Sequence, residues 1–189
     1  KKSTNRTIGE IMTGFGMLFF CLDIMETSLT PLRESPLMSE LFVKFGANPI
    51  LGILVGAGVT AALQSSSASV GILQALSVTG VVSWAAAIPI ILGQNIGSTV
   101  TAMLSVIGAS KNAKRTAIAH LYFNVIGTVI LMTAFYGLNA IVRFDFYSAA
   151  VTPFNIAVIH TLFNVISTVI LFPFSSGLRR LAERTVGDG

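Results

Sequence analysis

"TAALQSSSASVGILQA", residues 60–75, decides how the surrounding sequence can fold, because it places a polar cluster inside a run rich in Ala and Gly. The polar side chains are those of Gln64, Ser65, Ser66, Ser67 and Ser69. They divide the apolar run over 49–82 into two arms of roughly 14 residues, too short to cross a hydrocarbon core of ~30 Å as straight helices. We therefore predict a re-entrant helical hairpin over about 49–82, with the polar cluster at its tip.

A second polar interruption lies in the next apolar stretch, over about 84–109. In "LGQNIGSTVT", residues 92–101, Gly93 and Gly97 bracket Gln94 and Asn95. This pattern predicts a transmembrane helix that is broken at mid-length. Three further apolar stretches, over about 8–29, 116–138 and 154–175, fit spanning helices of about 20 residues.

The composition indicates an all-α membrane protein. Of 189 residues, 53% are hydrophobic and only 11% are charged, whereas a soluble domain carries about 25% charged residues. The net charge of +4 does not indicate a nucleic-acid partner, because the basic residues form short clusters beside apolar segments. With one Cys and two His, the chain can assemble neither an internal disulfide nor a thiolate metal site.

The distribution of basic residues predicts how the helices are oriented. If the chain starts in the cytoplasm, the first helix ends on the outer side, and the hairpin begins and ends on that side. The stretches over 84–109, 116–138 and 154–175 then cross the membrane inward, outward and inward. Nine basic residues are then cytoplasmic, namely Lys1, Lys2, Arg6, Lys111, Lys114, Arg115, Arg179, Arg180 and Arg184, and three are outside, namely Arg33, Lys44 and Arg143. This bias predicts a multi-pass protein of the plasma (inner) membrane with both termini cytoplasmic, and a cytoplasmic tail that begins at about 179–189.

The chemistry of the hairpin tip suits an anion and a cation. Ser65 to Ser67 can cap the second arm, whose free N–H groups and dipole favour an anion. The first arm ends at Leu63 with its carbonyl groups pointing toward the same place. Together with the Gln64 amide oxygen and the Ser hydroxyls, these carbonyls form a hard-oxygen site suited to Na⁺.

The second interruption carries similar chemistry. Gln94 and Asn95 supply amide oxygens and donors, and Ser98, Thr99 and Thr101 are expected to begin the next helical arm. Paired broken helices that bind an anion and its coupling ion near the membrane midplane are typical of secondary transporters. The alternative is that Gly and Ser side chains, as in the spacing from Gly52 to Gly56, simply let helices pack closely.

An internal repeat relates two of the predicted spanning helices. "AIAHLYFNVIGTVIL" at 117–131 and "AVIHTLFNVISTVIL" at 157–171 match at ten positions with an offset of 40 residues. His120 with Asn124, and His160 with Asn164, therefore lie on one helix face in each copy. They are candidates either for hydrogen bonds between helices or for supporting contacts to a substrate.

Four stretches carry a resemblance to a known family. They are "GAGVTAALQSSSASVGILQAL" (56–76), "IPIILGQNIGSTVTA" (88–102), "KNAKRTAIAHLYFNVIGTVI" (111–130) and "HTLFNVISTVILFPF" (160–174). Together they resemble the type II sodium-dependent phosphate cotransporters and their bacterial relatives. The resemblance implies two inverted repeats, each with one Gln-Ser-Ser-Ser signature, that couple inward Na⁺ movement to phosphate uptake.

The resemblance also assigns site residues. For phosphate it implies Gln64, Ser65, Ser66, Ser67, Asn95 and Thr99. The expected Na⁺ ligands are Gln64, Ser66, Gln94, Asn95, Ser98 and Thr99. Gln64, Ser66, Asn95 and Thr99 are assigned to both ions.

Only one Gln-Ser-Ser-Ser signature occurs, so residues 1–189 look like a single transmembrane domain, the second inverted-repeat half of a secondary transporter. Its partner is then a matching first repeat, in another chain or another part of the protein. Two oppositely oriented copies could also pair as a dimer, but the positive-inside bias counts against that arrangement.

The expected function is sodium-coupled symport of inorganic phosphate by alternating access, with no organic cofactor and no enzyme activity. A Na⁺-coupled carrier of another oxyanion or carboxylate would share the same physical features. An intramembrane serine hydrolase would use one of Ser65 to Ser67 with His120 or His160, but no Gly-x-Ser-x-Gly motif surrounds the serines. A membrane subunit that does not itself transport is the remaining alternative.

Overall fold

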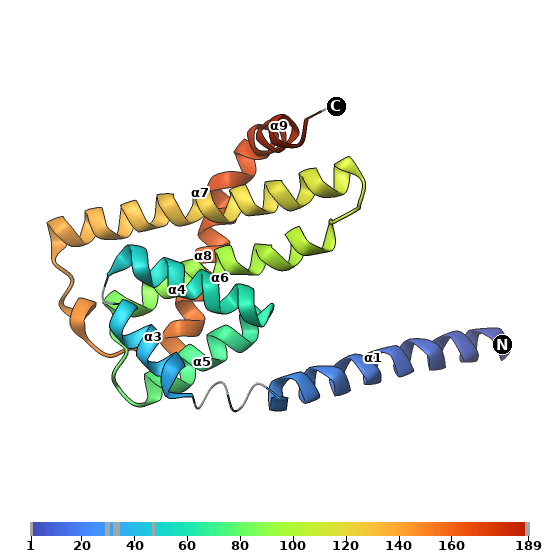
Figure 1. Cartoon of the computed structure of the whole chain (residues 1–189), viewed down its shortest axis with the longest axis horizontal. Coiled ribbons are helices and arrows are strands. Elements are labelled where there is room, and N and C mark those ends of the chain that lie inside the picture. Colours follow the sequence, from blue (N-terminus) through green and yellow to red (C-terminus); the bar gives the residue numbers. More distant parts are fainter. Residues whose placement is uncertain (1, 29–30, 32–34, 47, 188–189) are drawn as a thin grey trace. The chain divides into compact units, whose positions relative to one another are not determined.

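The computed structural model describes residues 2–28, 31, 35–46 and 48–187, and its helices carry the labels of Figure 1. The chain forms two compact units, Lys1–Ser35 and Pro36–Gly189. In the first unit, α1 (Lys2–Ser28) is a single helix over most of the stretch that the sequence predicts as the first spanning segment. The second unit contains all the candidate site residues.

The predicted hairpin is present as two short helices. After α3 (Pro36–Gly46) come α4 (Pro49–Leu63) and α5 (Ser66–Val78), which are 15 and 13 residues long. Asn48 caps α4, since its side-chain oxygen accepts a hydrogen bond from the Ile50 N–H at 3.0 Å. The pair of short helices around a polar tip is thus confirmed, whereas its re-entry into a membrane stays a prediction.

The predicted break in the following helix is wrong. α6 runs without interruption from Trp84 to Ser105, so residues 92–101 lie inside it. Its polar side chains bond to carbonyl groups of their own helix: Asn95 Nδ2 donates to the Ile91 oxygen at 3.0 Å, and Ser98 Oγ donates to the Asn95 oxygen at 2.7 Å. Ser98, Thr99 and Thr101 therefore do not begin a new arm, and this segment offers no free helix ends.

Close packing between α4 and α6 explains why glycines occur on the facing surfaces of these two helices. A Cβ atom added to Gly93 would clash with the carbonyl oxygen of Ile53, and one added to Gly56 would clash with that of Ile90. A Cβ atom added to Gly97 would lie 2.7 Å from the Cβ of Thr60. The packing alternative for Gly therefore holds at these three positions, where the missing side chain lets two backbones touch.

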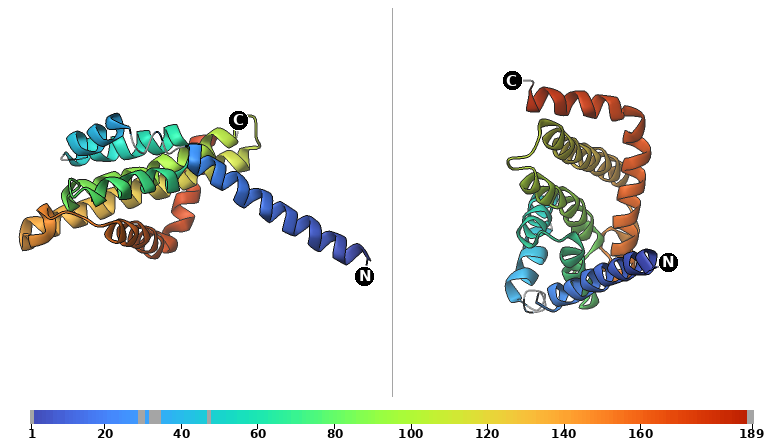
Figure 2. Two further views of the ribbon diagram at one scale, coloured as in Figure 1. Left: turned by 90° about the horizontal axis from the view of Figure 1, so that it is seen from below. Right: turned by 90° about the vertical axis from the view of Figure 1, so that its right-hand side faces the viewer.

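The rest of the unit consists of long helices joined by short loops. α7 (Lys111–Val142) is followed by the 3₁₀ turn η1 (Asp145–Ser148), α8 (Pro153–Leu171), the 3₁₀ turn η2 (Phe172–Phe174) and α9 (Ser175–Val186). Figures 1 and 2 show α8 crossing α6 and α7 instead of running alongside them. The segment predicted as a cytoplasmic tail is helical as far as Val186 and packs against α7.

Three helical runs within the described residues are long and apolar enough to cross a membrane. They are Trp84–Ser105, Lys111–Val142 and the continuous run Pro153–Val186. α1 is not among them, and it is less apolar on average than α6, α7 or α8. The chain is thus a membrane protein, while the crossing by α1 stays a prediction.

Two loops that the sequence places on the same side of the membrane lie together. The Val151 N–H donates to the Val82 oxygen at 2.9 Å, and the Trp84 N–H donates to the Ala149 oxygen at 3.0 Å. Aromatic rings gather at this end, with those of Trp84 and Phe146 4.9 Å apart. Such aromatic residues are enriched at membrane–water interfaces, which agrees with this end being one membrane surface.

Candidate functional site

The site begins at the turn between the two helices of the hairpin. Gln64 closes α4 in the left-handed conformation with φ 50°, which costs a non-glycine residue about 1–2 kcal/mol. Ser65 then caps α5, and its Oγ accepts a hydrogen bond from the Ala68 N–H at 3.2 Å. The polar break thus consists of two residues, and Ser66 and Ser67 occupy the first turn of α5.

A cavity of about 300 Å³ adjoins this helix start. Ser66, Ser67 and Val70 of α5 line it from one side, and His160, Ala157 and Thr161 of α8 line it from the other. The Nδ1 atom of His160 is buried and has no hydrogen-bond partner in the protein. A helix start, two serines and a histidine therefore line a space large enough for a small oxyanion.

A buried polar cluster lies deeper, where α4, α5 and α6 meet. Gln94 is fully buried, and its Nε2 donates to Ser69 Oγ of α5 at 3.0 Å. The Gln94 Oε1 atom and the Thr60 Oγ1 atom are also buried, and neither has a hydrogen-bond partner in the protein. Thr60 packs against Gly97, one turn along α6 from Gln94. Unpaired buried acceptors are costly, so these two oxygens are candidate ligands for a hard cation.

The other predicted residues of α6 bond within the protein. Asn95 Oδ1 accepts a hydrogen bond from Asn164 Nδ2 of α8 at 3.4 Å, and Thr99 Oγ1 donates to the Ile96 oxygen at 2.7 Å. Both residues are buried. The interhelical role predicted for Asn164 is thereby confirmed, and Asn95 joins two helices instead of lining the cavity beside Ser66 and Ser67.

The internal repeat produces a matching local bond in both copies. Asn124 Nδ2 donates to the His120 oxygen at 3.0 Å, and Asn164 Nδ2 donates to the His160 oxygen at 2.9 Å. The two helices also touch at equivalent positions, because a Cβ atom on Gly127 would lie 2.8 Å from Ser167 Oγ. The duplication therefore supplies a small residue to each side of the crossing between α7 and α8.

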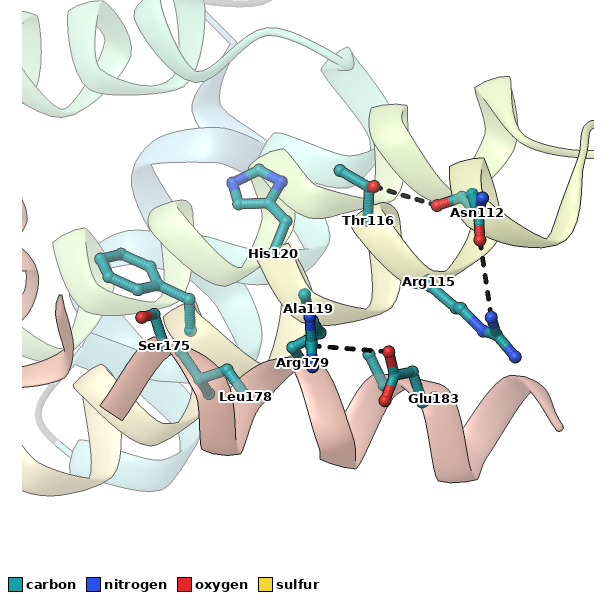
Figure 3. Close-up of a pocket in the computed structure, with 11 residues that line it drawn as sticks. Asn112, Arg115, Thr116, Ala119, His120, Ser175, Leu178, Arg179 and Glu183 are labelled. Atoms are coloured by element: carbon teal, nitrogen blue, oxygen red, sulfur yellow. Dashed lines mark hydrogen bonds and ion pairs between the residues drawn. The ribbon is translucent and has the colours of Figure 1, made fainter. Parts of the chain in front are cut away.

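The structure separates the two repeated histidines. His160 lines the cavity at the hairpin tip, whereas His120 lines a different pocket between α7 and α9, which is drawn in Figure 3. Gln64 is exposed and is not among the residues that line the tip cavity. The predicted site residues thus divide among the tip cavity, the buried cluster and the helix contacts.

Thr60 and Ser69 are candidate site residues that the sequence assignment missed. Ser69 belongs to the polar cluster of the quoted stretch, but a hydroxyl one turn into a helix has no distinctive sequence signature. Thr60 lies one turn before Gln64 on α4, so the spacing of four residues was an available signal. Its orientation toward α6 depends on packing, which the spacing does not reveal.

In a membrane protein, a capped helix start that adjoins a cavity is typical of membrane transport proteins. Residues 34–182 match the Na⁺/Pi-cotransporter family, and the chain belongs to this family. Because the family and the named relatives are transporters, the serines of the hairpin tip are not assigned a hydrolase mechanism.

Several proteins from bacteria and animals are similar to the chain. It is 29% identical over 127 residues to the uncharacterized protein YqeW of Bacillus subtilis, covering 67% of this chain and 41% of that protein. It is 27% identical over 132 residues to the putative inorganic phosphate export protein YjbB of Escherichia coli, covering 70% of this chain and 24% of that protein. It is 42% identical over 84 residues to the human sodium-dependent phosphate transport protein 2B, covering 42% of this chain and 12% of that protein.

The chain thus spans less than half the length of each of these relatives. No solved structure matches it.

Proposed function

We propose that the protein to which this chain belongs carries inorganic phosphate across the plasma membrane together with Na⁺, by alternating access. The observation that carries the proposal is the cavity that Ser66 and Ser67, at the start of α5, line together with His160 of α8. The N–H groups and dipole of a helix start attract a phosphate oxygen, and hydroxyls and an imidazole can donate to the others. The names of the relatives supply phosphate as the particular anion.

The coupling ion is assigned to the buried cluster beneath the tip. Na⁺ prefers hard oxygen ligands, and the oxygens of Thr60 and Gln94 are buried without partners. Ser69 joins this cluster to the helix that carries Ser66 and Ser67, because its Oγ accepts from Gln94 Nε2. A cation bound there would fix the start of α5 and add positive charge beside the anion, so binding of the two ions would be cooperative.

Neither the tip cavity nor the buried cluster contains a Lys or Arg side chain among its described members. An anion held by hydroxyls and backbone N–H groups is bound without a fixed ion pair, which favours release after transport. A carrier of another oxyanion would use the same groups, so competition by sulfate and by carboxylates distinguishes that alternative.

The test is uptake of radiolabelled phosphate into proteoliposomes that contain the intact protein, with an inward gradient of Na⁺ or of choline. We expect uptake only with Na⁺, and a loss of about tenfold or more for Ser66→Ala, since a hydrogen bond to a charged ligand contributes ~1.5–3 kcal/mol. Ser105→Ala is the matched control, because Ser105 is exposed and bonds only to the Ala102 oxygen of its own helix.

Uptake that does not depend on Na⁺, or that is equally insensitive to both substitutions, would overturn the proposal. The same vesicles loaded with phosphate also measure efflux, which matters because one relative is named a phosphate export protein.

A further inference from the structure

A second cavity, of about 560 Å³, lies between the start of α7 and α9. It is separate from the tip cavity and shares no residue with it. Figure 3 shows Asn112, Thr116 and His120 extending from α7 and Ser175, Leu178, Arg179 and Glu183 extending from α9 around it. Its volume suits a molecule larger than a single phosphate.

The cavity has an apolar interior and a basic rim. Ala119 and Phe123 of α7 and Leu178 and Ala182 of α9 form the apolar wall. Arg115 and Arg179 line the rim, and Glu183 is the only acidic residue among the described lining residues. Arg179 Nε lies 3.5 Å from Glu183 Oε1 in an exposed pair, which water and other ions screen easily.

Two contacts hold α9 against α7 and keep this cavity formed. The Arg115 Nη2 atom donates to the Gly187 oxygen at 3.1 Å, and the hydroxyls of Tyr122 and Thr185 lie 2.8 Å apart. α9 itself is amphipathic, with basic side chains beside apolar ones. A basic amphipathic helix that follows an apolar spanning helix lies at the membrane surface.

We infer that this cavity binds an anionic phospholipid, with the headgroup phosphate at Arg115 and Arg179 and the start of an acyl chain against the apolar wall. The charge supports this occupant, because Lys111, Lys114, Arg180 and Arg184 add further positive charge on the same two helices. Basic pockets at the positively charged ends of spanning helices bind the headgroups of anionic lipids. A zwitterionic lipid lacks the net charge for this rim, and a free phosphate leaves the apolar wall uncovered.

The test is native mass spectrometry of the intact protein, equilibrated with equimolar palmitoyl-oleoyl phosphatidylglycerol and phosphatidylcholine in detergent. We expect phosphatidylglycerol to be retained in preference to phosphatidylcholine. Arg179→Gln should lower that preference about fivefold, the effect of one basic residue near an anionic lipid. Arg180→Gln is the matched control, because it removes the same charge from the same helix but does not line the cavity.

A second variant tests the cavity independently of charge. Ala119→Trp fills the apolar wall and should reduce the retained phosphatidylglycerol as much as Arg179→Gln does, whereas Ala134→Trp, at an exposed position of α7, should not. Circular dichroism of each variant reports whether it has folded.

Equal retention of both lipids, or equal effects of Arg179→Gln and Arg180→Gln, would show only general attraction to a charged surface and would overturn the inference. Displacement of the lipid by millimolar glycerol 3-phosphate would overturn it in favour of a site for a soluble anion. These outcomes are independent of phosphate transport, because the experiment measures lipid retention alone.

Discussion

At the scale of single residues, the hydroxyl of Thr60 is the group whose role, in packing or in Na⁺ binding, can be tested most directly. Its hydroxyl is fully buried, yet it has no hydrogen-bond partner in the protein. A buried unpaired hydroxyl destabilises a fold by about 1–3 kcal/mol, which makes it a candidate to bind a further species. Na⁺ is that species in the proposed mechanism, with Gln94 Oε1 as a second ligand.

We predict opposite effects of Thr60→Val with and without sodium. In choline chloride the variant should be as stable as the native protein or more stable by about 1 kcal/mol, because the unpaired hydroxyl is gone. In NaCl the native protein should gain thermal stability by ligand binding, and the variant should need about tenfold more Na⁺ for the same gain. Differential scanning fluorimetry across a Na⁺ titration measures both effects.

Thr133→Val serves as the control, since Thr133 is exposed on α7. An unchanged Na⁺ dependence in Thr60→Val would remove Thr60 from the proposed cation site.

At the scale of elements, the contact between α4 and α6 positions the hairpin tip. α4 makes more of its contacts with α6 than with any other helix, and they involve backbone atoms at Gly56, Gly93 and Gly97. This close approach brings Thr60 near the α6 turn that carries Gln94. A shift of α4 away from α6 would therefore also disturb the buried cluster.

Gly93→Ala should destabilise the protein by about 1–3 kcal/mol, the usual cost of overpacking a close contact. The reason is that the added methyl group meets a backbone carbonyl of α4, which cannot rotate out of the way. Unfolding in detergent, followed by circular dichroism, measures the loss.

Gly58→Ala is the matched comparison on α4, because nothing lies within 4 Å of an added Cβ atom there. It should be neutral or stabilise the helix by roughly 0.5–1 kcal/mol, since Ala favours helix more than Gly does. Equal stability of the two variants would contradict the close packing described here.

At the scale of the whole molecule, apolar side chains on α4, α7 and α8 remain exposed. Ile50, Val129 and Val169 are 70%, 60% and 69% exposed, respectively. In a membrane protein such surfaces face lipid or another helical unit. Since the family resemblance implies two Gln-Ser-Ser-Ser signatures and this chain has one, a second unit with a matching hairpin tip stays a prediction.

We predict that residues 1–189, reconstituted alone, give no Na⁺-driven phosphate uptake above empty vesicles, whereas the intact protein does. The physical reason is that an anion bound at one hairpin tip has no protein ligands on the side where the second tip is expected. Circular dichroism of the reconstituted chain controls for folding. Transport by this chain alone would refute the half-transporter hypothesis.

The sequence alone predicted the elements that depend on local chemistry. The length of each apolar stretch and the run from Gln64 to Ser67 predicted two short helices with a polar turn, because short arms and a capping Ser are readable from the local sequence. The family was also recognisable from contiguous motifs.

Only the tertiary structure decided what the second polar segment does. Gly93 and Gly97 look the same in sequence whether they break a helix or let another helix approach, and the packing of α4 selects the second role. In the same way, the repeated residues His160 and His120 line two different cavities because different helices pack against α8 and α7. The reason is that a local pattern specifies which face of a helix is polar, whereas the neighbour that covers that face is set by contacts between residues far apart in the chain.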